Sequence, residues 1–194
     1  MQLRGYILKE DTYKFDPQEF FDKIGNNIDL WYWKSLALLS SAEAVEGSCG
    51  QTPSDPKNEE DVVEWMEIHG ITRMLRGMAL ECMFKALWLK YGGRLAVKGK
   101  YQCIPGTKDH DLCSLEEKIS EKIDTGLNSE ERKLLARLSF FIIYGRYPIR
   151  KSISSYPSSP CSDEPIHWCR WIPEDDEILN GVIEKLINLI TNEQ

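Results

Sequence analysis

The chain of 194 residues is long enough to bury the core of one domain without disulfides or metal ions, and we expect a single domain over residues 1–194. Hydrophobic residues make up 42% and charged residues 28%, a globular rather than a disordered composition. The net charge of −7 argues against a protein coated in nucleic acid. Because there is no apolar run of membrane-spanning length and no apolar secretory segment near the N-terminus, we expect a cytoplasmic protein with reduced cysteines.

Charge is segregated along the chain. Residues 73–101 hold seven basic residues and one acidic residue, and residues 129–152 hold six basic and two acidic residues. Residues 54–70 and 173–194 each hold six acidic residues and one lysine. This arrangement favours either a phosphate-binding surface in the middle of the chain or mutual neutralisation of these segments across helix faces.

The first helical pattern follows a short N-terminal arm. Residues 1–15 alternate weakly between apolar and polar, which is typical of a short strand or an irregular arm. Asp16 and Pro17 then resemble a helix N-cap followed by proline at the first helical position. The apolar pattern continues to about Glu46, and the Gly-Asn-Asn sequence at 25–27 predicts a kink or a split.

A second long helix is expected after a loop at residues 47–57. Apolar residues recur at threes and fours over about 58–91, and Gly92 and Gly93 stand where a C-terminal cap is expected. Residues 92–113 form a basic connector that contains glycine.

Two shorter helices and a final one complete the pattern. Asp111 or Ser114 opens a helix that ends near Gly126. Asn128 or Ser129 caps the next helix, which ends at Gly145. Residues 147–173 are rich in proline and serine and predict a long loop, and residues 174–191 carry the wide apolar stripe of a last helix. The fold class predicted is therefore all-α, a bundle of about five helices.

Three motifs follow one another in the middle of the chain. The first is a Glu-x-x-x-Lys pair, Glu81 and Lys85, and the second is a His-x-Leu-x-x-Leu helix start formed by His110, Leu112 and Leu115. The third is an Arg-Tyr pair at a helix end, Arg146 and Tyr147. Their order and spacing over residues 58–152 resemble the HEPN superfamily, small helical bundles named for higher eukaryotes and prokaryotes nucleotide binding.

The resemblance implies a protein that binds RNA, a nucleotide or a partner protein in a bacterial toxin–antitoxin or antiphage system. The implied partners are a nucleotidyltransferase or another defence-system protein, and the implied assembly is a homodimer or a heteromer. Catalytic members are metal-independent endoribonucleases that use an arginine followed, four to six residues later, by a histidine. Arg146 matches that arginine, but Lys151, Ser152 and Ile153 occupy the histidine positions. We therefore predict a bundle without the usual ribonuclease motif.

Two alternatives to this prediction stay open. One is a ribonuclease toxin in which Arg146 works with Lys151 or His110, and the other is a structural adaptor whose acidic ends engage a partner. Arg146, Tyr147, Arg150 and Lys151 form the candidate binding segment, because three cations within six residues suffice for one or two phosphates. The competing interpretation is that Arg146 forms a buried ion pair with Glu81.

Glu81, Lys85 and His110 are the remaining candidate binding residues. Glu81 and Lys85 are either a buried acid and base or, more simply, a solvated pair one helical turn apart. His110 precedes a helix start and has either a chemical role or a packing and capping role. Cysteines and histidines gather at 103–113 and 161–169 without a Cys-x-x-Cys knuckle, so we expect no metal ion, and no nucleotide-cofactor motif predicts a cofactor.

Overall fold

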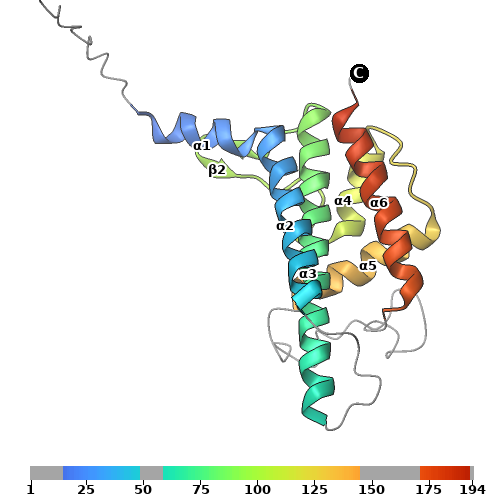
Figure 1. Ribbon diagram of the computed structural model, residues 1–194. Helices are drawn as coiled ribbons and strands as arrows, with labels where there is room; N and C mark the ends of the chain where they lie inside the picture. The colour runs from blue at the N-terminus through green and yellow to red at the C-terminus, as the bar shows by residue number, and fades with distance from the viewer. Residues whose placement is uncertain (1–14, 49–58, 145–170, 193–194) are drawn as a thin grey trace, which may run out of the picture.

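The computed structural model describes residues 15–48, 59–144 and 171–192 (Figure 1). Within these ranges the chain forms a helical bundle with one short hairpin, which confirms the all-α prediction. The elements are α1 (Pro17–Gly25), α2 (Ile28–Ser48), α3 (Glu59–Lys90), β1 (Ala96–Val97), β2 (Lys100–Tyr101), α4 (Leu112–Ser120), α5 (Ser129–Tyr144) and α6 (Pro173–Thr191). The expected arm before Phe15 and the expected loop from 147 to 170 lie outside the described residues. None of the described helices combines the length and the apolar character needed to cross a membrane.

The split between α1 and α2 has a side-chain cause. Asp16 caps α1 by accepting from the backbone N–H groups of the first turn, and Pro17 takes the first helical position, as predicted. Asn26 then leaves the helix, and its amide oxygen accepts from Leu95 N and Ala96 N at 2.8 and 3.1 Å. The predicted kink is therefore a break, and the break holds the hairpin against α1.

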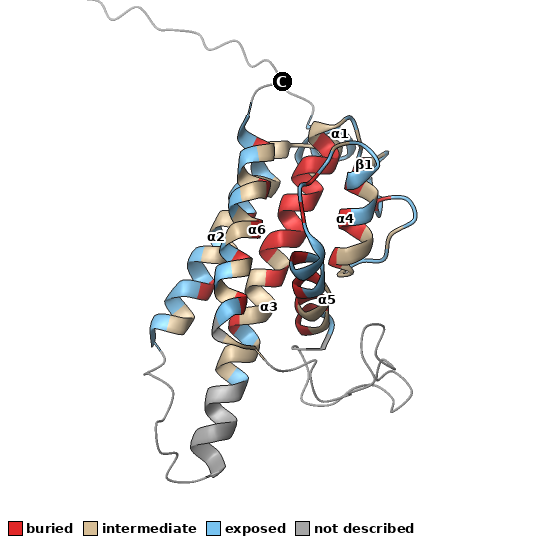
Figure 2. Cartoon of the chain, turned by 90° about the vertical axis from the view of Figure 1, so that its right-hand side faces the viewer, coloured by how far each residue is buried: buried red, intermediate tan, exposed pale blue. Residues whose placement is uncertain are grey.

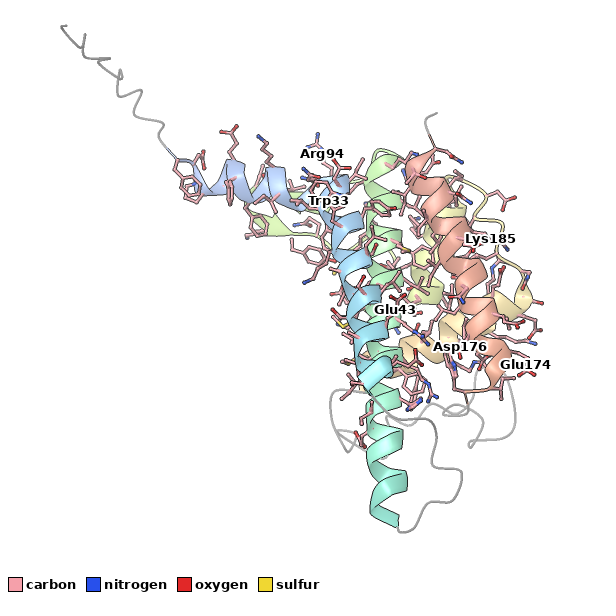
Figure 3. The ribbon with its side chains drawn as sticks, in the orientation of Figure 1. Trp33, Glu43, Arg94, Glu174, Asp176 and Lys185 are labelled. Carbon is pink, nitrogen blue, oxygen red and sulfur yellow. The ribbon has the colours of Figure 1, made fainter. Side chains whose placement is uncertain are left out.

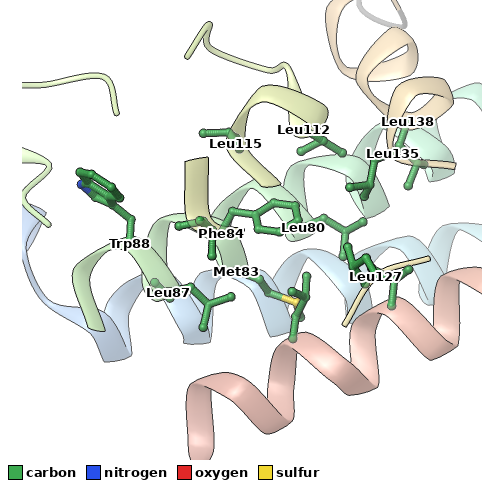
Figure 4. Packing of buried hydrophobic residues seen from close by; sticks show 14 of the residues in the cluster. Leu80, Met83, Phe84, Leu87, Trp88, Leu112, Leu115, Leu127, Leu135 and Leu138 are labelled. Atoms are coloured by element: carbon green, nitrogen blue, oxygen red, sulfur yellow. The ribbon is translucent and has the colours of Figure 1, made fainter. Parts of the chain in front are cut away.

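The central element is α3, which is buried on all sides in its C-terminal half. Every residue from Ala79 to Leu89 is buried, because α2, α4, α5 and α6 all pack on this helix (Figure 2). Gly77 allows α5 to approach closely, since an added Cβ would lie 2.7 Å from a side-chain carbon of Ile142. Figure 4 shows Leu80, Phe84 and other core residues between the helices.

The hairpin β1–β2 was missed by the sequence analysis, which expected only a connector there. Ala96 pairs with Tyr101 and Val97 with Lys100 in an antiparallel register. Lys98 and Gly99 form the turn with φ angles of 53° and 73°, and two successive positive φ angles are typical of a tight hairpin turn. The usual sequence signal for such a turn is Asn-Gly or Asp-Gly. Here lysine takes the first position, so the sequence does not show that signal.

Capping at the later helices agrees with the sequence signals. Asp111 is the N-cap of α4 and accepts from Ser114 N at 3.2 Å. Asn128 caps α5, and its own N–H donates to Glu131 at 2.8 Å, which completes a capping box. However, α4 ends at Ser120, six residues before the expected end at Gly126.

Candidate functional site

Several cations of the two basic segments, residues 73–101 and 129–152, form ion pairs inside the protein. Arg76 on α3 bridges Glu46 of α2 at 2.7 Å and Asp176 of α6, which is labelled in Figure 3, at 2.8 Å. Arg137 of α5 pairs with Asp175 of α6. Within the described ranges, these pairs favour mutual neutralisation over an extended basic surface. They also engage two acids of the C-terminal acidic segment.

Arg73 contacts aromatic rings, and Lys90 donates to backbone oxygens. The Arg73 guanidinium lies 5.4 Å from the Phe141 ring centroid and 5.1 Å from that of Trp171, and its burial lowers its pKa. Trp171 packs against the core and so belongs to the bundle at this end. Lys90 donates to the backbone oxygens of Leu189 and Ile190 at 2.9 and 3.0 Å, which satisfies the C-terminal end of α6.

Several further exposed cations lie on the hairpin and on the segments that flank it. Four side chains here are exposed and pair with no acid in the described part of the chain: Arg94, Lys98, Lys100 and Lys108. These four residues are called the hairpin cations. Tyr101, 41% exposed, follows Lys100 in β2.

A buried polar cluster lies directly behind Tyr101. The Glu81 carboxylate on α3 is 7% exposed, and its two oxygens have different partners. Oε1 accepts from Lys85 Nζ at 2.7 Å, and Oε2 lies 2.9 Å from His110 Nδ1. The Glu81–Lys85 pair is thus buried, and the expectation of a solvated pair is wrong, because the hairpin and the start of α4 cover this face of α3. Among the described residues, the hydrogen-bond partners of the two Glu81 oxygens are Lys85 and His110, and neither is an arginine.

Lys85 is held between two aromatic rings. Its Nζ lies 5.0 Å from the Trp31 ring centroid and 5.3 Å from that of Tyr101. Burial alone lowers the pKa of an ammonium, but the charge and hydrogen bond of Glu81, with the Tyr101 hydroxyl, outweigh it and raise the pKa of Lys85. Lys85 is therefore a permanent cation rather than a base.

His110 connects this cluster to the surface. Its backbone has a φ of 69°, and its side chain is 34% exposed. Asp111, not His110, caps α4, so the capping role expected of the histidine is wrong. When Nδ1–H donates to Glu81, the neutral ring carries its lone pair on Nε2, which is the arrangement of a carboxylate-oriented general base.

The rim of the cluster contains an acid and a thiol. The Tyr101 hydroxyl and Cys103 Sγ each lie 3.4 Å from Asp109. The hydrogen bond to Asp109 raises the pKa of Cys103, and burial raises that of Cys82 to about 11, so neither thiol is activated as a nucleophile. The described cysteines, Cys82, Cys103 and Cys113, form no disulfide with one another. No group of three potential metal ligands occurs among the described residues.

The structure thus brings together three of the candidate residues, Glu81, Lys85 and His110. The other four, listed here, lie outside the described residues, beyond the end of α5: Arg146, Tyr147, Arg150 and Lys151. Sequence reasoning missed Trp31 and Tyr101, and no motif spacing marks either of them.

The fold and this cluster define an all-α bundle with a polar centre beside a cationic hairpin. No family model, no curated protein and no solved structure matches the chain. Its function is therefore argued from the cluster and the hairpin.

Proposed function

We propose that this chain is a HEPN-like bundle that binds RNA or a nucleotide in the cytoplasm, without the family's usual ribonuclease motif. The proposed setting is a bacterial toxin–antitoxin or antiphage system, with a nucleotidyltransferase or another defence-system protein as a partner. The observation that carries the proposal is that one hairpin both contacts the Glu81–Lys85–His110 cluster, through Tyr101 and Lys85, and carries the exposed cations Lys98 and Lys100.

The first support is the convergence of two of the resemblance motifs. Lys85 and His110 belong to different motifs and are 25 residues apart in sequence. Both nevertheless contact the carboxylate of Glu81. Leu112 and Leu115 of the second motif are buried in the core. The motifs are thus parts of one structural unit.

The second support is the chemistry of the hairpin. Phosphate backbones are bound by exposed lysine and arginine, and nucleobases stack on exposed aromatic rings. The hairpin cations supply four such charges. Tyr101 supplies an exposed aromatic ring, and the Lys85 ammonium lies over that ring. A short single-stranded RNA is the ligand that best matches this combination.

The test is RNA binding by the full chain, measured by fluorescence anisotropy with a labelled single-stranded RNA over a range of salt concentrations. Replacing Lys98, Lys100 and Lys108 by alanine should weaken binding and lower the slope of log affinity against log salt by about 2, since each phosphate contact contributes about 0.7. The matched control replaces Lys118 and Lys133, exposed or half-exposed lysines paired with neighbouring glutamates, and should change neither quantity. Equal losses in both variants, or no binding at low salt, would reject the proposal.

A ribonuclease is the second candidate, and the carboxylate-oriented imidazole of His110 is the observation that favours it. In this alternative Arg146 holds the phosphate and His110, or Lys151, moves the proton. Expression should then arrest growth, and the chain should cleave RNA even in the presence of a chelator. Arg146→Ala should abolish both effects, and so should replacing whichever residue moves the proton, by His110→Ala or Lys151→Ala. RNA that stays intact with the wild-type chain excludes this candidate.

A further inference from the structure

The helix α2 carries few charges, and among the described elements it packs mainly on one neighbour, α3. Only four of its 21 residues are charged: Asp29, Lys34, Glu43 and Glu46. Among the described elements its main contact is α3, and Figures 1 and 2 show it at the edge of the bundle, in front of α3 in Figure 1. An α-helix that is apolar on all sides is normally buried on all sides.

The face of α2 that contacts α3 packs through small residues seven apart. Ser35 and Ala42 are both fully buried there. The opposite face has the same spacing and is exposed along its whole length. Its members recur at threes and fours and are called the outer stripe: Leu30, Trp33, Ala37, Ser40, Ala44 and Gly47. Trp33 is 61% exposed and Leu30 38%, although both are large and apolar.

We propose that two copies of this chain pair through the outer stripe, with their α2 helices parallel, to form a two-fold four-helix bundle with the two α3 helices outside. The stripe occupies the core positions of a coiled coil, with Leu30, Ala37 and Ala44 in one set and Trp33, Ser40 and Gly47 in the other. The small residues allow close approach along the C-terminal half, and Leu30 and Trp33 fill the wider N-terminal half.

Charge complementarity selects a second copy in the parallel orientation. Asp29 and Lys34 flank the stripe on opposite sides, are both exposed, and pair with no residue in the described part of the chain. They are five residues apart, which is the offset at which flanking positions of parallel helices meet. Asp29 of each copy therefore faces Lys34 of the other. Antiparallel pairing would leave Lys34 opposite serine and form no such contact.

This pairing goes beyond the proposed function and does not depend on it. The outer stripe shares no residue with the hairpin cations or with the Glu81 cluster. The candidate segment that begins at Arg146 follows α5 in sequence, whereas α2 and α5 contact different sides of α3 (Figure 2).

The first experiment measures the mass of the full chain by light scattering coupled to gel filtration, at micromolar concentrations. The wild type should be a dimer. Ala44→Arg places a long cation in the closely packed C-terminal half of the stripe and should give a monomer with an unchanged circular dichroism spectrum. The matched control, Asn188→Arg on the exposed side of α6, should stay a dimer. A monomeric wild type, or a dimer that survives both Ala44→Arg and Trp33→Lys, overturns the proposal.

The second experiment tests the orientation. Ala44→Cys should form a disulfide between the two copies on mild oxidation, because equivalent positions face each other only in a parallel pair. Lys34→Asp should weaken dimerisation about tenfold, and adding Asp29→Lys should restore it. A dimer that Ala44→Arg disrupts but that shows neither the cross-link nor the charge rescue overturns the parallel pairing.

Discussion

Glu81 and Glu116 are two buried carboxylates in different surroundings. Their side chains are 7% and 2% exposed. Glu116 accepts two bonds from Arg132 at 3.1 Å and one each from Ser120 and Thr125, at 2.8 and 2.6 Å. It ties the end of α4 to α5.

The partners of the two carboxylates decide what each can do. The Arg132 side chain is half exposed and always charged, and the remaining bonds to Glu116 come from hydroxyls. Glu81 instead bonds a buried lysine and a titratable, partly exposed histidine, beside exposed cations. Burial of an acid therefore does not mark a functional site by itself. The chemistry and accessibility of its partners do.

The largest effect is expected for Glu81→Ala. The change leaves Lys85 as a buried ammonium without its counter-ion, and breaking a buried pair in this way costs about 3–5 kcal/mol. Urea unfolding followed by circular dichroism measures the loss. Glu130→Ala, which breaks an exposed pair with Lys133, is the control and should change stability by no more than about 0.5 kcal/mol. If Glu81→Ala lost less stability than Glu116→Ala, the stranded lysine would not be the larger cost, contrary to this comparison of the two carboxylates.

Glu116→Ala should destabilise the protein less, by about 2 kcal/mol, which is typical of losing hydrogen bonds to a charged group. Arg132 turns to water after the change, because half of its side chain is already exposed. The same unfolding experiment measures it. A loss as large as that of Glu81→Ala would show that a stranded partner matters less than the number of bonds lost.

Acid should weaken the Glu116 contacts in a predictable direction. Burial alone raises a carboxyl pKa, but the bonds from Arg132, Thr125 and Ser120 outweigh it and lower the pKa of Glu116 in the folded protein. Its contribution is therefore present above the unfolded pKa of about 4.3 and is lost as the pH falls through the folded value. Melting temperatures measured below neutrality should fall more steeply for the wild type than for Glu116→Gln. Parallel curves would show that this carboxyl has no lowered pKa.

The smallest effect on stability is expected for Arg146→Ala. Each oxygen of Glu81 has a partner in Lys85 or His110, so Glu81 keeps its counter-ion when Arg146 is replaced. The melting temperature should stay nearly unchanged, while RNA affinity falls if Arg146 holds a phosphate. A loss of about 3–5 kcal/mol with unchanged binding would instead make Arg146 a structural partner.

Local signals in the sequence determined where most helices begin and end. The caps at Asp16 and Asn128 and the start of α6 at Pro173 agree with the prediction, as does the length of α3. These features depend on backbone groups within one turn of the residue concerned, so neighbouring residues suffice to predict them.

Tertiary structure alone decided which charges meet and which remain exposed. Arg76 and Asp176 are 100 residues apart, and their pairing depends on how α3 and α6 pack. Glu81 has the spacing of an ordinary surface pair with Lys85, and it is buried only because the hairpin and the start of α4 cover it. A helical pattern shows which residues share a face, but burial depends on the elements that pack against that face. That is why the sequence named Glu81, Lys85 and His110 separately, and only the fold made them one cluster.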